Sequence, residues 1–239
     1  PGMALPKISY LAFDNGFLDE DDSHNPLVIR KNKLGFDNST TNTDHKIIGD
    51  DLCCDQIQIV YEDFNQNDLL QPYKRYRITY FALPMDGNDS TAKNKYYGVY
   101  KTKECWMQDE SSSGGWTSDT AKCNECFRKQ LVRSHVVDME FLLFDQDGVD
   151  LYNMSGTNTY PQPDNDSRYD LNKIRQVDIA LSFRSGRNFF RNKPSGDNER
   201  FIKTLRKDRN SADRGYVDKY LRESVVVSVF TRNIGESYE

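Results

Sequence analysis

Residues 136–144 read VVDMEFLLF, and apolar side chains alternate with acidic ones along much of this run. Successive side chains of a β-strand point to opposite faces of the sheet, so the run predicts a half-buried strand. Its predicted inner face comprises Val137, Met139, Phe141 and Leu143, and its outer face Asp138 and Glu140. The Asp147-Gly148 pair that follows offers the positive-φ positions of a hairpin turn.

The same alternation returns in residues 175–184, which read RQVDIALSFR. The predicted inner face comprises Val177, Ile179, Leu181 and Phe183, and the outer face Gln176, Asp178 and Ser182. Two strands with this pattern predict an antiparallel sheet that packs one face on a core and exposes the other face to water.

Other segments complete the predicted sheet. We expect further strands at residues 27–30, 55–61, 75–83 and 96–101. The last three of these would form a meander. Residues 222–232, RESVVVSVFTR, are apolar on both faces, which predicts a central or well-covered strand. Residues 4–14, ALPKISYLAFD, have the apolar spacing of the last turns of an amphipathic helix.

The composition is that of a globular protein. The 239 residues include 14 Tyr and 13 Phe, which bury large areas although the hydrophobic fraction is only 36%. No linker or change of composition divides the chain, so we expect one domain. The net charge is −5 and no basic stripe is present, which argues against duplex nucleic acid as a partner.

The sequence has no apolar run long enough to span a membrane and no signal peptide. Residues 1–3, Pro-Gly-Met, look like the remnant of an engineered cut, and residues 4–14 look like the end of a longer helix. We therefore expect that an export or anchoring segment has been removed.

Five cysteines are the candidate disulfide residues: Cys53, Cys54, Cys105, Cys123 and Cys126. In an oxidising compartment, Cys105 would close a loop with Cys123 or Cys126, a bridge that stabilises the fold by roughly 3 kcal/mol. A vicinal bridge between Cys53 and Cys54 is less favoured than bonds elsewhere. The alternative is zinc, but a structural zinc site needs four ligands, and His135 is the only histidine near the three later cysteines. We favour disulfides with unassigned pairs and expect no metal site.

The sequence contains no catalytic signature. The motifs of serine hydrolases, zinc proteases and phosphate-binding loops are missing, and His24, His45 and His135 are the only histidines. Residues 145–150 resemble half of a calcium loop, and Asp19–Asp22 form an acidic cluster. A turn and a solvated charge run are the favoured interpretations of these two segments. We therefore expect no enzyme, no cofactor and no small-molecule substrate.

In their order along the chain, several segments resemble the soluble domain of PilW-type minor pilins of type IV pili and, more distantly, the J-type minor pseudopilins of type II secretion. The most specific are Leu131–Gly148, Ile174–Arg184 and Phe230–Asn233. The resemblance implies an α+β fold in which an N-terminal helix, largely missing from this sequence, packs on an antiparallel sheet with long disulfide-bearing loops. Residues 1–239 would be one pilin-like domain, with the sheet and its loops in residues 55–234.

The resemblance also implies a structural role. Members of this family prime pilus assembly and occupy the pilus tip through contacts with other minor pilins and the major pilin. The missing helix would anchor the subunit in the inner membrane of a Gram-negative bacterium. This domain would then lie in the periplasm and later outside the cell, in the pilus.

Two other classes of protein stay open from the sequence. A carbohydrate-binding or adhesive β-rich module would also have short alternating strands, and Trp106 and Trp116 would be its stacking platforms. A hydrolase would need a converging acid/base pair, which the sequence does not reveal.

Overall fold

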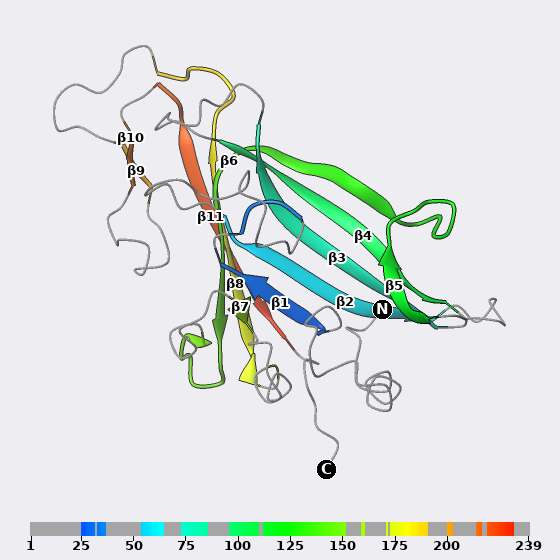
Figure 1. Ribbon diagram of the computed structural model, residues 1–239. Coiled ribbons are helices and arrows are strands. Elements are labelled where there is room, and N and C mark those ends of the chain that lie inside the picture. Colours follow the sequence, from blue (N-terminus) through cyan, green and yellow to red (C-terminus); the bar gives the residue numbers. More distant parts are fainter. Residues whose placement is uncertain are drawn as a thin grey trace.

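The structure of the chain is a computed structural model. It describes residues 25–31, 33–36, 54–64, 73–85, 96–109, 112–151, 159–160, 171, 173–190, 200–202, 214–216 and 219–231. Within these ranges the chain forms eleven β-strands (Figure 1). They are β1 (Leu27–Arg30), β2 (Gln56–Phe64), β3 (Tyr73–Pro84), β4 (Tyr97–Asp109), β5 (Ser112–Thr117), β6 (Phe127–Phe144), β7 (Thr159–Tyr160), β8 (Gln176–Arg184), β9 (Arg200–Ile202), β10 (Arg214–Tyr216) and β11 (Arg222–Phe230).

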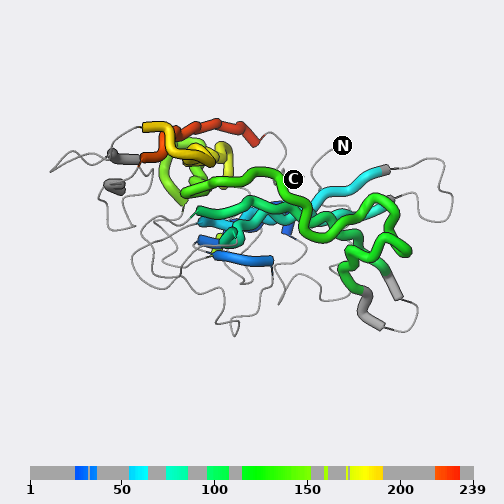
Figure 2. Tube along the Cα trace, turned by 90° about the horizontal axis from the view of Figure 1, so that it is seen from above, coloured from blue at the N-terminus to red at the C-terminus, as the bar shows by residue number. Residues whose placement is uncertain are grey.

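Nine of these strands form one sheet. Its order is β11-β8-β6-β4-β3-β2-β1-β7, with β5 paired to β4, and the neighbouring strands are antiparallel. In the view from above, the colours change from red at β11 through green to blue at β1, which follows this order across the sheet (Figure 2). Strands β9 and β10 form a separate two-stranded sheet.

This architecture corrects the expected α+β fold. The elements of the described residues are all β-strands, almost all in one antiparallel sheet, and none of them is a helix. The helix was expected from the resemblance and from the apolar spacing of one short segment. In most of the chain, however, apolar and polar residues alternate, which is the pattern of β-strands. Residues 4–14, where the helix was predicted, lie outside the described residues. In the part of the chain that is described, no helix is long and apolar enough to cross a membrane.

Several strand predictions are confirmed. Strand β1 coincides with the predicted residues 27–30, and β2, β3 and β4 are consecutive neighbours, as a meander requires. The turn after β6 also forms, with a φ of 75° at Gly148. The Asp145 carboxylate accepts hydrogen bonds from the backbone N–H groups of Asp147 and Val149, at 2.9 and 2.8 Å. Asp145 therefore stabilises a turn, as the sequence predicts.

Strand β6 joins two parts of the sheet and, with 18 residues, is the longest of the described strands. Its first half pairs with β4, from Phe127 opposite Lys103 to Val136 opposite Tyr97. Its second half pairs with β8, from Val136 opposite Phe183 onward. Figure 1 shows the accompanying change of direction, because β2, β3 and β4 run obliquely while β8 and β11 run steeply.

A bulge in β6 shifts the predicted faces. The register changes between Val136 and Asp138, and His135 has a positive φ of 61°. An extra residue in one strand turns the neighbouring side chains to the other face. As a result, Val136 takes the place in the main core that alternation predicted for Val137.

The second half of β6 is buried on both faces, which corrects the expected wet face. Asp138 and Glu140, predicted to face water, are only 4% and 2% exposed. The Asp138 carboxylate accepts a hydrogen bond from the backbone N–H of Met139 at 3.0 Å. On β8, the predicted outer residue Ser182 is also buried, and its Oγ lies 2.6 Å from the Oγ of Ser224 in β11. Alternation reports which residues share a face, but it does not report whether that face is covered.

Strand β11 is an edge strand, which corrects the central or well-covered strand predicted for residues 222–232. Within the described sheet it pairs with β8 alone. Its apolar side chains are 44% to 70% exposed: Val225, Val226, Val227, Val229 and Phe230. A strand that is apolar on both faces is usually covered by other apolar side chains on both faces. In the described part of the chain, the apolar side chains of β11 remain largely exposed.

Asp55 closes a gap in the backbone hydrogen bonds of β6. Beyond Val136, β6 no longer pairs with β4, so its edge on that side needs other partners. The backbone N–H of Asp55 donates to the Met139 carbonyl at 2.7 Å, and the backbone N–H of Phe141 donates to the Asp55 carboxylate at 3.0 Å. Fully buried, Asp55 thus takes the place of a residue in a neighbouring strand.

We expect Asp55→Ala to destabilise the fold by about 1–3 kcal/mol, because the buried N–H of Phe141 loses its acceptor. Asp55→Asn keeps an amide oxygen at the same position and should retain most of the stability. Urea unfolding followed by far-ultraviolet circular dichroism measures both variants. Equal stability of the wild type and Asp55→Ala would show that this hydrogen bond does not stabilise the fold.

Candidate functional site

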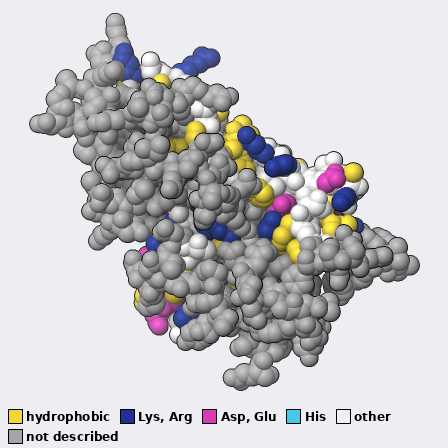
Figure 3. Space-filling model, in the orientation of Figure 1, with side chains coloured by type: hydrophobic (Ala, Val, Ile, Leu, Met, Phe, Trp, Pro, Cys, Tyr) yellow, Lys and Arg dark blue, Asp and Glu magenta, His cyan; other side chains and the backbone are white. Residues whose placement is uncertain are grey.

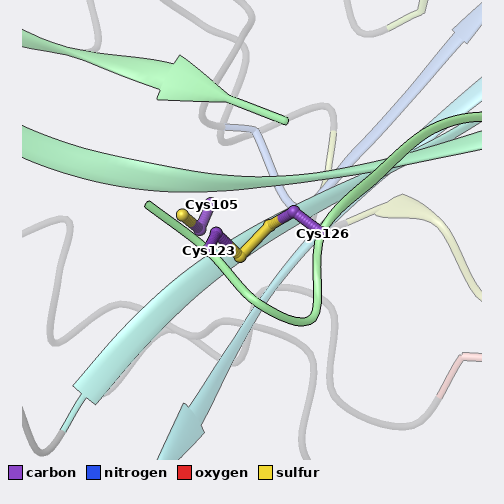
Figure 4. Close-up of side chains that lie close together, drawn as sticks. All are labelled: Cys105, Cys123 and Cys126. Carbon is purple, nitrogen blue, oxygen red and sulfur yellow. A yellow bond between two sulfur atoms is a disulfide. The ribbon is translucent and has the colours of Figure 1, made fainter. Parts of the chain in front are cut away.

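Three cysteines from two parts of the chain form one buried cluster (Figure 4). Cys105 lies in the second half of β4, while Cys123 and Cys126 lie in the turn between β5 and β6. Their three Sγ atoms all lie within 4.8 Å of one another, and the side chains are buried. Together with Tyr76 of β3, this cysteine cluster forms a second hydrophobic core, separate from the main one.

Local hydrogen bonds shape the turn that carries Cys123 and Cys126. The Asp119 carboxylate accepts a hydrogen bond from the backbone N–H of Ala121 at 2.9 Å, and the Asp119 carbonyl accepts one from the N–H of Cys123 at 2.8 Å. The N–H of Cys126 then donates to the Cys123 carbonyl at 3.0 Å. The four residues from Cys123 to Cys126 therefore form a tight turn, which brings the two cysteines close together.

An ion pair connects this turn to β4. Lys103 lies two residues before Cys105, and its Nζ lies 2.9 Å from the Glu125 carboxylate within the turn. The same Nζ lies 4.1 Å from the ring centroid of Tyr76. Because the Glu125 side chain is 56% exposed, we expect this ion pair to stabilise the fold by less than about 1 kcal/mol.

The cysteine cluster contains one disulfide and one free thiol. Cys123 is bonded to Cys126, and Cys105 is free. A disulfide in this loop is therefore confirmed, but the expected pairing through Cys105 is corrected, because the tight turn brings its own two cysteines together. Cys54 is buried and disulfide-bonded. The sequence candidates that lie outside the described residues are Cys53, His24, His45 and the acidic cluster Asp19–Asp22.

Burial raises the pKa of the Cys105 thiol, which favours the neutral thiol over the thiolate. The positive charges of Lys74 and Lys103 act in the opposite direction and offset only part of this effect. Burial likewise raises the pKa of Tyr76. The folded cluster therefore holds a thiol of low reactivity.

Aromatic and thioether side chains surround the cluster. Tyr61 of β2 stacks on Tyr76 of β3, with ring centroids 5.5 Å apart. Tyr61 and Met107 are partly buried and pack against the cluster. Met107 follows Cys105 by two residues in β4, so the two side chains share a face of the strand. Sequence reasoning missed Met107, although this spacing from Cys105 was an available signal.

His135 is not part of the cluster. Its ring stacks on Tyr96 with centroids 5.0 Å apart, and its Nδ1 lies 3.0 Å from the Ser134 hydroxyl oxygen. Tyr96 directly precedes β4, whereas Cys105 lies nine residues farther along the same strand. At roughly 3.3 Å per residue the two positions are about 30 Å apart. The histidine considered as a zinc ligand is therefore remote from the three cysteines.

The two tryptophans considered as stacking platforms face each other. Trp106 of β4 lies opposite Trp116 of β5, and their rings meet edge-on with centroids 5.4 Å apart. The guanidinium carbon of Arg77 lies 4.6 Å from the ring centroid of Trp116. The Arg77 Nε also lies 2.7 Å from the Glu104 carboxylate. Arg77 thus covers one of the two faces of Trp116.

Basic side chains lie over aromatic rings elsewhere in the sheet. The guanidinium carbon of Arg184 lies 3.9 Å from the ring centroid of Tyr96 and 4.2 Å from that of Tyr220. Lys129 lies 5.2 Å from the ring centroid of Tyr100. On the face seen in Figure 3, Lys and Arg side chains lie beside apolar ones. Arg184 and Lys129 are therefore both held against aromatic rings of the chain itself.

Comparison with known proteins gives a weak structural likeness. No family model matches the chain, and no curated protein matches it. Among solved structures, the chain is similar to a type IV-like pilin from Thermus thermophilus, with a TM-score of 0.37 and 8% sequence identity over 96% of this chain and 98% of that chain. A likeness at this TM-score does not by itself establish a fold or a function.

We expect Cys105 to react with iodoacetamide only after the protein is unfolded, because the thiol is free but buried. Peptide mass mapping without reduction should then find the label on Cys105 and an intact bond between Cys123 and Cys126. A disulfide from Cys105 to either of these residues would contradict the assignment. Rapid labelling of Cys105 in the folded protein would contradict its protection.

Proposed function

We propose that this chain is the domain of a structural subunit, a PilW-type minor pilin of a type IV pilus. In this role it helps to prime pilus assembly and lies at the pilus tip, in contact with other minor pilins and the major pilin. The proposed role involves no enzymatic activity. The proposed location is the periplasmic side of the inner membrane of a Gram-negative bacterium, and later the extracellular filament. A minor pseudopilin of a type II secretion system is the alternative.

The segments that resemble this family support the proposal, because they are neighbours in the sheet. Leu131–Gly148 contains most of β6, Ile174–Arg184 contains β8, and Phe230 ends β11. Phe141 of β6 lies opposite Ile179 of β8, which in turn lies opposite Val227 of β11. The segments that resemble the family are therefore adjacent in the sheet, although they are far apart in the sequence.

The observation that carries the proposal is the apolar edge of the sheet at β11. Along its nine residues, β11 pairs with β8 on one side and with no described strand of the sheet on the other. Backbone N–H and C=O groups at such an edge readily pair with a strand of another chain. Val225, Val226 and Val227 are each about half exposed at this edge. A long apolar edge is a liability for a monomer and a contact surface for a subunit of an assembly.

The exposed side chains of β11 continue the core of the molecule. Val229 lies opposite Val177, a core residue, and Val225 lies opposite Leu181, which packs against the core. Residues two apart in a strand share a face, so the apolar face extends from the core to the edge of the sheet. We therefore propose an apolar edge strand of a neighbouring pilin subunit as the partner of β11.

A carbohydrate-binding module is less well supported. A stacking platform needs an open aromatic face, whereas Trp116 has Arg77 over one face and meets Trp106 edge-on.

The proposal is tested on the full-length gene product in its own host. Surface filaments are sheared off and analysed by mass spectrometry for this subunit. In the family that the chain resembles, the mature subunit begins with Phe, so a methylated N-terminal Phe would identify the processed form. We expect to find it in the pilus fraction. Recovery of the subunit with secretion pseudopili would instead support the alternative, a minor pseudopilin of a type II secretion system. An intact periplasmic protein with ordinary signal cleavage and no filament association would overturn both.

We expect Val227→Lys to lower incorporation of the full-length subunit into filaments by about tenfold or more, equivalent to roughly 1.4 kcal/mol. A charge on a strand edge opposes pairing with another strand, while an exposed substitution changes the unfolding free energy by about 0.5 kcal/mol or less. Val132→Lys is the matched control, because Val132 in β6 is 49% exposed and Val227 is 51% exposed. Quantitative mass spectrometry of sheared pili measures both. The same loss in the two variants would contradict a specific role for β11.

A further inference from the structure

We propose that Cys105, Cys123 and Cys126 bind one Cu(I) ion when the disulfide between Cys123 and Cys126 is reduced. The ligand class is a soft, thiophilic monovalent metal ion, bound in a trigonal site of three thiolates. This inference does not depend on the pilin assignment, since it rests on the geometry and chemistry of the cysteine cluster.

The three sulfur atoms are already gathered at one place, where two of them are bonded to each other. All three Sγ atoms lie within 4.8 Å of one another, and they come from β4 and from a turn fixed by its own hydrogen bonds. A metal ion at about 2.3 Å from each of three thiolates holds the sulfurs about 4 Å apart. Reduction of the bond between Cys123 and Cys126 frees these two sulfurs to move apart to this distance, and Cys105 already lies beside them.

The surroundings of the cluster favour a soft ion. Met107 packs against the cluster and shares a face of β4 with Cys105, so a thioether accompanies the three thiols. Thiolates and thioethers select Cu(I) over Mg²⁺ and Ca²⁺, which prefer oxygen ligands. Tyr61 and Tyr76 add apolar rings beside the sulfurs. Such walls limit the access of water and of competing ligands.

Zinc matches the site less well. Structural zinc sites are tetrahedral and use four protein ligands. In the described ranges, the group of close potential ligands at this place consists of the three cysteines alone. The nearby carboxylate of Glu125 is already engaged by Lys103. Three thiolates without a fourth hard ligand favour Cu(I).

The site forms only after a defined reduction. A dithiol reductant gives two electrons and two protons to the bond between Cys123 and Cys126, which becomes two thiols while the reductant becomes a disulfide. Binding of Cu(I) then displaces one proton from each of the three thiols. Copper remains Cu(I) throughout, so binding consumes no further oxidant or reductant.

The test is an anaerobic titration of the whole reduced chain with Cu(I), supplied as its acetonitrile complex in competition with bicinchoninate. We expect one tightly bound ion in the wild type and at least about 100-fold weaker binding in Cys105→Ser, since even loss of an outer contact weakens metal sites 10- to 100-fold. Copper held by Cys53 and Cys54 would be the same in both proteins, so the difference isolates the cluster. Unchanged affinity in Cys105→Ser would overturn the proposal.

Two further measurements guard against a variant that misfolds. Met107→Leu keeps the side-chain volume nearly constant, and because Met107 lies beside the site without being one of the three ligands, it should weaken Cu(I) binding by less than about tenfold, with an unchanged circular dichroism spectrum. X-ray absorption at the copper edge of the wild type should find three sulfur neighbours at about 2.3 Å. Coordination by two sulfurs, or equally tight binding to the oxidised protein, would overturn the three-cysteine site.

Discussion

Every backbone N–H and C=O of a buried strand needs a hydrogen-bond partner, and the path of β6 shows how this chain meets that requirement. The strand pairs with β4 along its first half and with β8 along its second half. Where the pairing with β4 stops, Asp55 supplies the partners of Met139 and Phe141. The main core, the position of β8 and the apolar edge at β11 all depend on this change of partner.

The alternation of apolar and polar residues predicted most strands of the sheet, because it indicates directly which side chains share a face. It could not report which strands lie in the middle, because strand order depends on contacts between residues far apart in the sequence. For this reason the pattern placed Asp138 and Glu140 on a solvent-exposed face, whereas both are buried. It also placed β11 inside the sheet, whereas its apolar side chains are exposed. The bulge beside Val136 was not predicted for a different reason. One inserted residue changes which side chains face the core, but it does not alter the composition of the segment.

The cysteine cluster was predictable in its members but not in its arrangement. The spacing of Cys123 and Cys126 places them in one turn, yet the position of Cys105 beside them depends on the pairing of β4 with β3, which sets Cys105 opposite Tyr76. The sequence left the pairs unassigned and allowed a bond from Cys105, whereas the turn brings Cys123 and Cys126 together and leaves Cys105 free. The expected helix rested on family resemblance and a short apolar spacing, neither of which reports the contacts made by this sequence.

The continuity of β6 also has a mechanical consequence. Its first residue, Phe127, directly follows Cys126, and its second half is hydrogen-bonded to β8 and through β8 to β11. A pull along the axis of β11 loads these two ladders in shear, so that many hydrogen bonds resist together. Along β6 itself the tension is carried by peptide bonds. A force applied at the apolar edge therefore passes through two hydrogen-bonded ladders to β6 and then along its peptide bonds to the end of the sheet that holds the cysteines.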